Sequence, residues 1–291
     1  MSATLRLSIA GLGAVVQALE ADLDLEPHGA AARFAVDDVA ADLTVRARWT
    51  TALDRVRTAP VFDSGALWQL HRSTGGWLFQ FESPSLGPAP YKMAWVNSTF
   101  TDTDLALNRP AFAHQSTVYP LEFPLDELLF IHMLSRGRGV ELHGCAVVDT
   151  SGEASLFVGQ SGAGKSTTAR LWAAEPGVTI LSDDRVVVRQ VGQELMAFGT
   201  PWHGDEVFAA PGPAVLSRIF FLKHGSINRV TPTSGADATA RLFACSFVPF
   251  YDRHALEFAL ALFTTIADRI ACSELEFAPN RSAVDFVREH A

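Results

Sequence analysis

Apolar residues come mostly in short alternating runs or short continuous stretches, which predicts a chain richer in strands than in helices. Leu5, Leu7 and Ile9 alternate with polar residues near the start, as in a strand with one buried face. Runs of the same kind predict further strands at 32–36, 77–82 and 91–100. The first 122 residues are therefore expected to form a β-rich α+β region, and they carry no recognisable chemical motif.

Apolar residues spaced by three and four positions predict helices at 124–134, 165–174 and 255–270. The first of these has Pro124 in its first turn, Asp126 and Glu127 close behind, and glycines after its end. We place a domain boundary just before this helix, so that residues 1–122 form one domain and residues 123–291 a second.

In the second half, apolar stretches predict strands at 140–148, 154–158, 178–184, 185–189, 195–199 and 219–222. Short turns join the first two of these strands, and likewise 185–189 and 195–199, so both pairs are predicted as antiparallel hairpins. Hairpins beside a strand that leads into a helix indicate a mixed sheet. The expected fold class is α/β, with a mixed sheet in the second domain.

One contiguous motif stands between the strand at 154–158 and the helix at 165–174. Gly159–Ser166 reads GQSGAGKS and fits G-x-x-x-x-G-K-[ST], the phosphate-binding P-loop, in the strand–loop–helix context that this motif requires. Its backbone N–H groups and the start of the following helix are suited to phosphate oxygens. The residues expected to contact a nucleotide are Gly159, Ser161, Gly162, Ala163, Gly164, Lys165, Ser166 and Thr167.

The motif implies ATP or GTP as ligand, together with Mg²⁺. Lys165 would place a positive charge on the β- and γ-phosphates, and the Ser166 hydroxyl would ligate Mg²⁺. Asp183 and Asp184 stand at the end of the predicted strand at 178–184, where ligand sites of α/β sheets lie. One of these carboxylates is expected to hold Mg²⁺, and the other to accept the proton of an attacking hydroxyl. An aspartate-rich turn without a chemical role is the alternative.

The loop at 200–206 is dense in polar residues, as functional loops are. We expect His203, Asp205 and Glu206 to bind the acceptor of the phosphoryl group or a metal ion, with an ordinary loop as the alternative. We also expect residues 1–122 to share in an acceptor cleft with this loop.

The composition bears on the binding partners of the chain and on its cellular compartment. The net charge of −9 argues against a general binder of nucleic acid or of membrane surfaces. Three widely spaced cysteines form neither a disulfide framework nor a zinc pattern, which fits a reducing cytoplasm. No apolar stretch reaches 18 residues, so no membrane span is expected. The oligomeric state stays open, a homo-oligomer included.

The order His143-Gly144, hairpin, Gly159–Ser166 and Ser182-Asp183-Asp184 resembles the catalytic domain of HPr serine kinases, over about residues 140–210. That fold is related to the core of ATP-dependent phosphoenolpyruvate carboxykinase. The resemblance implies Asp183 as base and Asp184 as metal-binding or orienting group, although this order can be reversed. It also implies an active-site histidine at His143, which would pair with the base or contact the transferring phosphate. A buried structural histidine is the alternative.

Two departures from HPr kinases argue against HPr as substrate and against phosphorylase activity. Thr167 stands where those enzymes usually have glutamate, and a later Gly-Arg-Asn-type loop is absent from the sequence. The chain looks more like the smaller relatives that phosphorylate free serine or peptide serines. We therefore expect an ATP-dependent kinase acting on a serine hydroxyl of a peptide, protein or small molecule. A P-loop ATPase or nucleotide switch and a carboxykinase-like enzyme are the alternatives.

Overall fold

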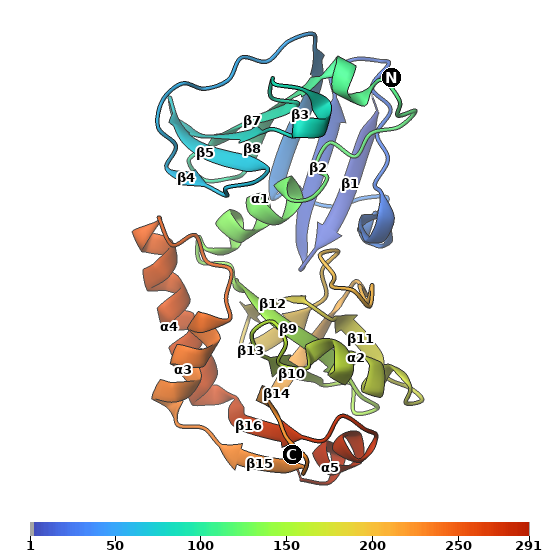
Figure 1. Ribbon diagram of the computed structural model, residues 1–291, viewed down its shortest axis with the longest axis vertical. Helices are drawn as coiled ribbons and strands as arrows, with labels where there is room; N and C mark the ends of the chain where they lie inside the picture. The colour runs from blue at the N-terminus through green and yellow to red at the C-terminus, as the bar shows by residue number, and fades with distance from the viewer. Residues whose placement is uncertain (1–2, 291) are drawn as a thin grey trace. The chain divides into compact units, whose positions relative to one another are not determined.

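The computed structural model describes residues 3–290, and the chain divides into two compact units (Figure 1). Unit 1 consists of Met1–Ser8 and Leu12–Leu129, and unit 2 of Ile9–Gly11 and Phe130–Ala291. Each unit contains an eight-stranded mixed sheet, and helices accompany the second. The predicted α/β class with a mixed sheet is thus confirmed. The boundary after residue 122 and the roles of the two predicted domains stay predictions.

The sheet of unit 1 has the strand order β1-β2-β3-β8-β7-β6-β5-β4. Its strands are β1 Thr4–Ile9, β2 Leu12–Ala18, β3 Leu43–Thr50, β4 Phe62–Asp63, β5 Trp68–Ser73, β6 Gly76–Phe81, β7 Lys92–Asn97 and β8 Asp102–Asn108. β3 pairs in parallel with β2 and with β8, whereas the pairs from β8 through β4 are antiparallel. Three short 3-10 helices complete the unit, η1 Gly29–Phe34, η2 Pro84–Leu86 and η3 Arg109–Phe112.

The strand predicted at 32–36 is wrong. Most of this segment belongs to η1, whose buried residues are Ala30, Ala31 and Phe34. Ala31 and Phe34 are three positions apart, which places both on one side of a 3-10 turn. The run was too short for its apolar spacing to separate a strand from a turn. The strands predicted near the start, at 77–82 and at 91–100, are confirmed as β1, β6 and β7.

The sheet of unit 2 has the order β10-β9-β12-β13-β14-β16-β15, and β11 pairs with β9. Its strands are β9 Val140–Val148, β10 Ala154–Val158, β11 Thr179–Ser182, β12 Arg185–Val191, β13 Glu194–Phe198, β14 Pro213–His224, β15 Arg229–Pro232 and β16 Ala271–Phe277. Both predicted hairpins, β9–β10 and β12–β13, are confirmed as antiparallel pairs. β10 also pairs in parallel with β14, so the pairing closes into a ring of five strands.

The α-helices are α1 Leu125–Leu134, α2 Lys165–Ala173, α3 Gly235–Ala244, α4 Arg253–Arg269 and α5 Ser282–His290. The three predicted helices are confirmed as α1, α2 and α4.

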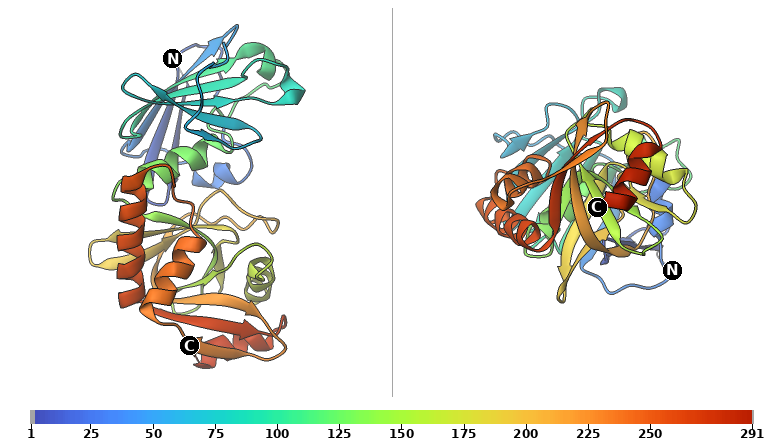
Figure 2. Two further views of the ribbon diagram at one scale, coloured as in Figure 1. Left: turned by 60° about the vertical axis from the view of Figure 1, so that its left-hand side comes forward. Right: turned by 90° about the horizontal axis from the view of Figure 1, so that it is seen from below.

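Two apolar cores cover the two faces of the sheet of unit 2. α3 and α4 lie side by side (Figure 2). Their buried residues share a core with Leu156 and Val158 of β10. α2 and α5 share the other core with Phe157. All five residues of β10 are buried, and all but Ser155 are apolar, because both faces of the strand are covered.

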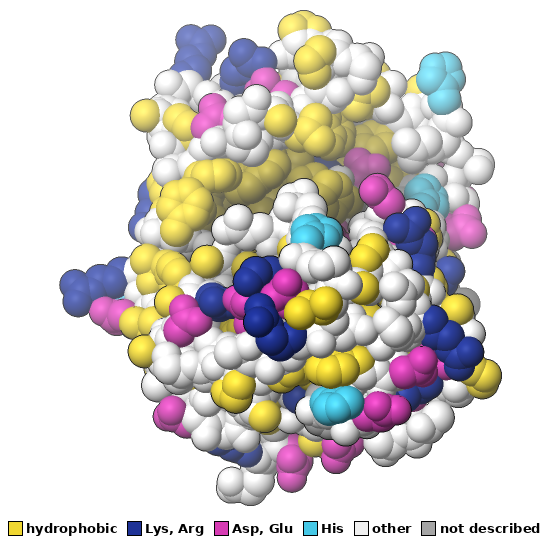
Figure 3. Space-filling model, turned by 60° about the horizontal axis from the view of Figure 1, so that its bottom comes forward, with side chains coloured by type: hydrophobic (Ala, Val, Ile, Leu, Met, Phe, Trp, Pro, Cys, Tyr) yellow, Lys and Arg dark blue, Asp and Glu magenta, His cyan; other side chains and the backbone are white. Residues whose placement is uncertain are grey.

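Charged side chains of both signs are interspersed on the face shown in Figure 3. Cys145, Cys245 and Cys272 are free thiols, and the first and last are buried, as expected of small core residues. Within residues 3–290, no helix is both long enough and apolar enough to cross a membrane.

Candidate functional site

The glycine-rich loop, Gly159–Ser166, leads from the buried strand β10 into α2. Gly162 and Gly164 have φ angles of +82° and +104°, a region that favours glycine. A Cβ atom on Gly164 would lie 2.7 Å from the ring of Phe277, so this position also lacks room for a side chain. The loop thus turns tightly at the start of α2, where the first N–H groups of the helix have no partner within the helix.

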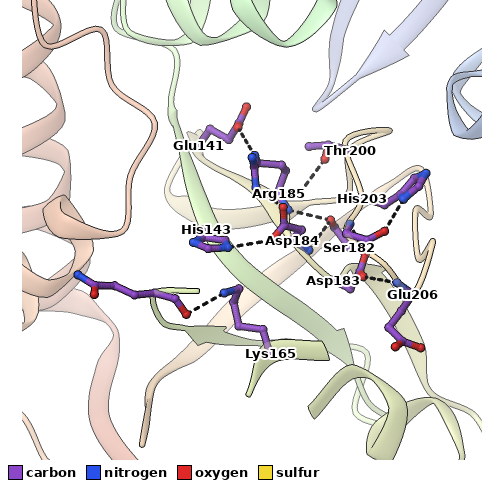
Figure 4. A network of polar contacts seen from close by, with 12 residues as sticks. Glu141, His143, Lys165, Ser182, Asp183, Asp184, Arg185, Thr200, His203 and Glu206 are labelled. Atoms are coloured by element: carbon purple, nitrogen blue, oxygen red, sulfur yellow. Dashed lines mark hydrogen bonds and ion pairs between the residues drawn. The ribbon is translucent and has the colours of Figure 1, made fainter. Parts of the chain in front are cut away.

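Lys165 is folded back onto this loop. Its Nζ donates to the carbonyl oxygens of Gly159 at 2.9 Å and Gln160 at 3.1 Å, and only 6% of the residue is exposed (Figure 4). Burial lowers the pKa of the Lys165 ammonium, and the negative charge of Asp184 offsets this in part. In this position, the Lys165 ammonium can donate to an anion at the loop in place of the two carbonyl oxygens.

His143 and Asp184 form a hydrogen-bonded pair, with 2.8 Å between Nε2 and Oδ1 (Figure 4). The sheet brings them together, because Arg185 of β12 pairs in register with His143 of β9. The N–H of Gly144 also donates to the Asp184 carbonyl at 3.0 Å. A proton on Nε2 of His143 serves this contact, which leaves Nδ1 for another partner.

Arg185 contacts Asp184 from the side opposite His143, through Oδ2. Burial by itself raises the pKa of Asp184, but the hydrogen bond from His143 and the charge of Arg185 outweigh it. The pKa of this carboxyl therefore lies below its usual range, and the group stays ionised at neutral pH. Lys165 contributes in the same direction, which places its charge within electrostatic reach of Asp184.

Asp183 has different surroundings. Its Oδ1 accepts the N–H of Gly204 at 3.0 Å, and its Oδ2 accepts that of Glu206 at 3.1 Å. The residue is 1% exposed, whereas the side chain of Asp184 is 24% exposed. Asp183 therefore anchors the loop at 200–206 to the end of β11.

The loop at 200–206 contributes mainly backbone groups to this arrangement. His203 contacts the carbonyl of Gly204 through Nδ1 at 2.7 Å, and Glu206 lies 3.6 Å from Arg170 of α2. Both side chains point away from His143 and Lys165 in Figure 4, and Asp205 is exposed. The structure thus groups His143, Lys165 and Asp184, with Ser166 and Thr167 in the first turn of α2, but leaves His203 and Glu206 outside this group.

Four residues that contact this group or the glycine-rich loop were not predicted from the sequence: Glu141, Arg185, His224 and Phe247. Arg185 and Glu141 meet at 3.5 Å, and Arg185 lies 4.0 Å above the ring of Phe247. His224 contacts the carbonyl of Gly162 on the glycine-rich loop. The one signal was the position of Arg185 directly after the aspartate pair.

A short segment, Cys245–Phe247, supplies Phe247. It runs along β9 beyond the point where β10 ends, since the His143 N–H donates to Cys245 O at 2.7 Å and the Phe247 N–H to Glu141 O at 3.0 Å. The ring of Phe247 meets that of His143 edge to face, with 5.9 Å between centroids. This segment is therefore one wall of the group around His143.

A magnesium ion fits this donor set only with help from a ligand. Among the described residues, no group of three or more His, Cys, Asp or Glu side chains could hold a metal ion. Mg²⁺ at phosphate sites commonly takes one or two protein oxygens and completes its shell with phosphate and water. The Ser166 hydroxyl and the Asp184 carboxylate are oxygens of that type.

Comparisons with known proteins found little. The sequence matches no family model and no curated protein. Among solved structures, it is similar to the Hpr(Ser) kinase/phosphatase from Coxiella burnetii, at 12% sequence identity and a TM-score of 0.29. That match covers 52% of this chain and 95% of the other. A likeness this low establishes no function for this chain.

Proposed function

We propose that this chain is an ATP-dependent phosphotransferase that moves the γ-phosphate to a serine hydroxyl. The supporting observation is the combination of a G-x-x-x-x-G-K-S loop at a strand-to-helix junction with Lys165 and the His143–Asp184 pair close by. Phosphoryl transfer requires positioning and charge neutralisation more than covalent chemistry, and this group provides both. A mixed-sheet P-loop core of the HPr kinase type is part of the proposal.

The nucleotide phosphates would bind along Gly159–Thr167. Backbone N–H groups at the start of α2 favour anions, and Lys165 would transfer its contacts from loop carbonyls to phosphate oxygens. Ser166 would hold Mg²⁺, and the Asp184 carboxylate would be available to assist. When bound, the ion neutralises phosphate charge.

Asp184 is the residue we assign to the acceptor hydroxyl, in place of Asp183, which the resemblance implies as the base. It is the more exposed of the two aspartates, it is ionised, and it faces Lys165, whereas Asp183 is committed to two backbone N–H groups. Asp184 orients the serine hydroxyl and takes its proton. The serine oxygen bonds to the γ-phosphorus, and the bond from this phosphorus to the bridging oxygen breaks with its electron pair leaving on ADP. His143 holds the carboxylate from Oδ1.

The test is nucleotide binding and turnover in the wild-type chain and in Lys165→Ala. Titration with ATP and Mg²⁺ should show binding that the variant weakens at least tenfold, since the variant removes the cation of the loop. Turnover should rise when serine-containing peptides or free serine are added. Lys223→Ala, which removes an exposed lysine paired with Glu274 and Glu276 of β16, is the control and should bind ATP normally. Equal affinity in wild type and Lys165→Ala would refute nucleotide binding at this loop.

If the rate of ATP turnover does not change when serine-containing peptides or free serine are added, the chain is an ATPase or a nucleotide switch instead. Residues 1–122, His203, Asp205 and Glu206 remain proposed contributors to acceptor binding. Substitution of His203 by alanine should then raise the KM of the acceptor more than that of ATP.

A further inference from the structure

We propose that Arg185 is a positioning residue, which fixes the Asp184 carboxylate and is itself fixed by Glu141 and Phe247. The inference deepens the proposed function and rests on it, because it concerns the carboxylate that we assign to the acceptor hydroxyl.

The Asp184 carboxylate is held at both oxygens. His143 of β9 occupies Oδ1 at 2.8 Å, and the Arg185 guanidinium occupies Oδ2. Two charge-assisted contacts on opposite oxygens leave the carboxylate no freedom to rotate. Loss of either contact would restore rotation and spread the carboxylate over several orientations.

Arg185 is anchored rather than free to meet a substrate. Its Nε lies 3.5 Å from Oε1 of Glu141, its guanidinium covers the ring of Phe247 at 4.0 Å, and 20% of its side chain is exposed. The Glu141 side chain has no exposed surface. A carboxylate buried so fully is stabilised by a neighbouring cation, because an unpaired buried charge is costly.

The register of the sheet makes this arrangement a single unit. Glu141 and His143 are two positions apart on β9, so their side chains share one face of the strand. Arg185 pairs in register with His143, so its side chain emerges on that same face. Glu141, Arg185 and Asp184 therefore form a chain of alternating charge, and His143 contacts its last member at the proposed reaction centre.

The experiment compares Arg185→Gln, Arg185→Lys and Glu141→Gln with the wild-type chain. Arg253→Gln is the matched control, since it removes an arginine that is 87% exposed on α4. For Arg185→Gln we expect kcat to fall about 10- to 100-fold while the KM for ATP changes less than twofold, because misplacement of a reacting group affects the transfer step. Arg185→Lys should restore little of kcat, since an ammonium cannot reproduce the planar guanidinium contacts. Glu141→Gln should lower kcat by a smaller factor.

A second readout does not depend on turnover. The ¹⁵N shifts of the His143 imidazole report which nitrogen carries the proton. We expect a fixed Nε2–H form in the wild type and a mixture of tautomers in Arg185→Gln and Glu141→Gln, with Arg253→Gln unchanged. A normal kcat together with an unchanged tautomer in Arg185→Gln would overturn the inference. A wild-type chain without turnover would refute the proposed function instead, and the tautomer measurement would still decide whether Arg185 fixes Asp184.

Discussion

Asp183 and Asp184 are adjacent in sequence and opposite in surroundings. Both oxygens of Asp183 accept backbone N–H groups of the loop at 200–206, whereas those of Asp184 contact His143 and Arg185. Backbone partners are fixed and neutral, so they suit a structural anchor. Partners that are themselves charged or titratable suit a carboxylate that takes part in chemistry.

We therefore expect Asp183→Asn and Asp184→Asn to fail in different ways. At Asp183, an amide nitrogen would face a backbone N–H, and an unmade buried hydrogen bond costs about 1–3 kcal/mol, seen as a lower free energy of unfolding in urea. At Asp184, turnover should fall about 10²–10⁴-fold in a variant that remains folded, the usual effect of losing a general base. Loss of Mg²⁺ affinity rather than rate in Asp184→Asn would make that residue the metal ligand.

At the scale of elements, the junction of β10 and α2 depends on packing from β16. Phe277 fills the space beside Gly164, and no atom lies within 4 Å of a Cβ atom built on Gly162. The two glycines share a positive φ and differ in their surroundings. Substitutions at these two glycines therefore separate the effect of backbone strain from that of crowding against Phe277.

Gly164→Ala should weaken ATP binding more than Gly162→Ala. Both variants force alanine into a left-handed conformation, at about 1–2 kcal/mol. Gly164→Ala also places a Cβ atom 2.7 Å from Phe277, so the loop or the ring must move. Thermal unfolding and ATP titration of both variants measure the two effects. Equal losses of affinity would show that Phe277 does not constrain the loop.

The elements that could be predicted are those whose signal lies in a short stretch of sequence. Contacts between distant parts of the chain could not be predicted. The glycine-rich loop is eight contiguous residues, and the hairpin β9–β10 lies directly before it, so both were predictable. The contacts of Arg185 depend on the register of β9 with β12 and on Phe247, far downstream in the chain. No local sequence pattern specifies how β9 and β12 pair, so the contacts that hold Arg185 and Asp184 in place could not be predicted.

At the scale of the whole chain, an ionic cluster ties its last helix to the rest of unit 2. Arg288 of α5 contacts Asp149 at 2.9 Å and Glu175 at 3.0 Å, and its guanidinium lies 5.2 Å from the ring centroid of Trp172. Arg281 reaches Glu175 as well, at 2.9 Å. These contacts join α5 to the turn after β9 and to the end of α2.

Arg288→Ala should lower the free energy of unfolding by about 1–3 kcal/mol, because it leaves a nearly buried Glu175 with one partner fewer. Arg253→Ala, which breaks an exposed pair, should change it by less than about 0.5 kcal/mol. The hydrogen bond from Arg288 holds the pKa of Asp149 below its usual range. That stabilisation is complete above about pH 4 and is lost as pH falls further, toward the lowered folded pKa. Urea unfolding of wild type and Arg288→Ala should therefore converge in acid, and a constant difference would contradict this account.

The closed ring of five strands has a consequence for the opening motions of the chain. β10 is paired on both edges, with β9 on one side and β14 on the other. A strand with no free edge exchanges its amide hydrogens only when a large part of the unit opens. In deuterium exchange, Leu156–Val158 should therefore be among the slowest segments, and Ser161–Gly164 in the loop after it should exchange faster. Added ATP should slow exchange in the loop alone, because the strand beneath it is already protected. The loop could thus open locally without loosening the sheet that carries it.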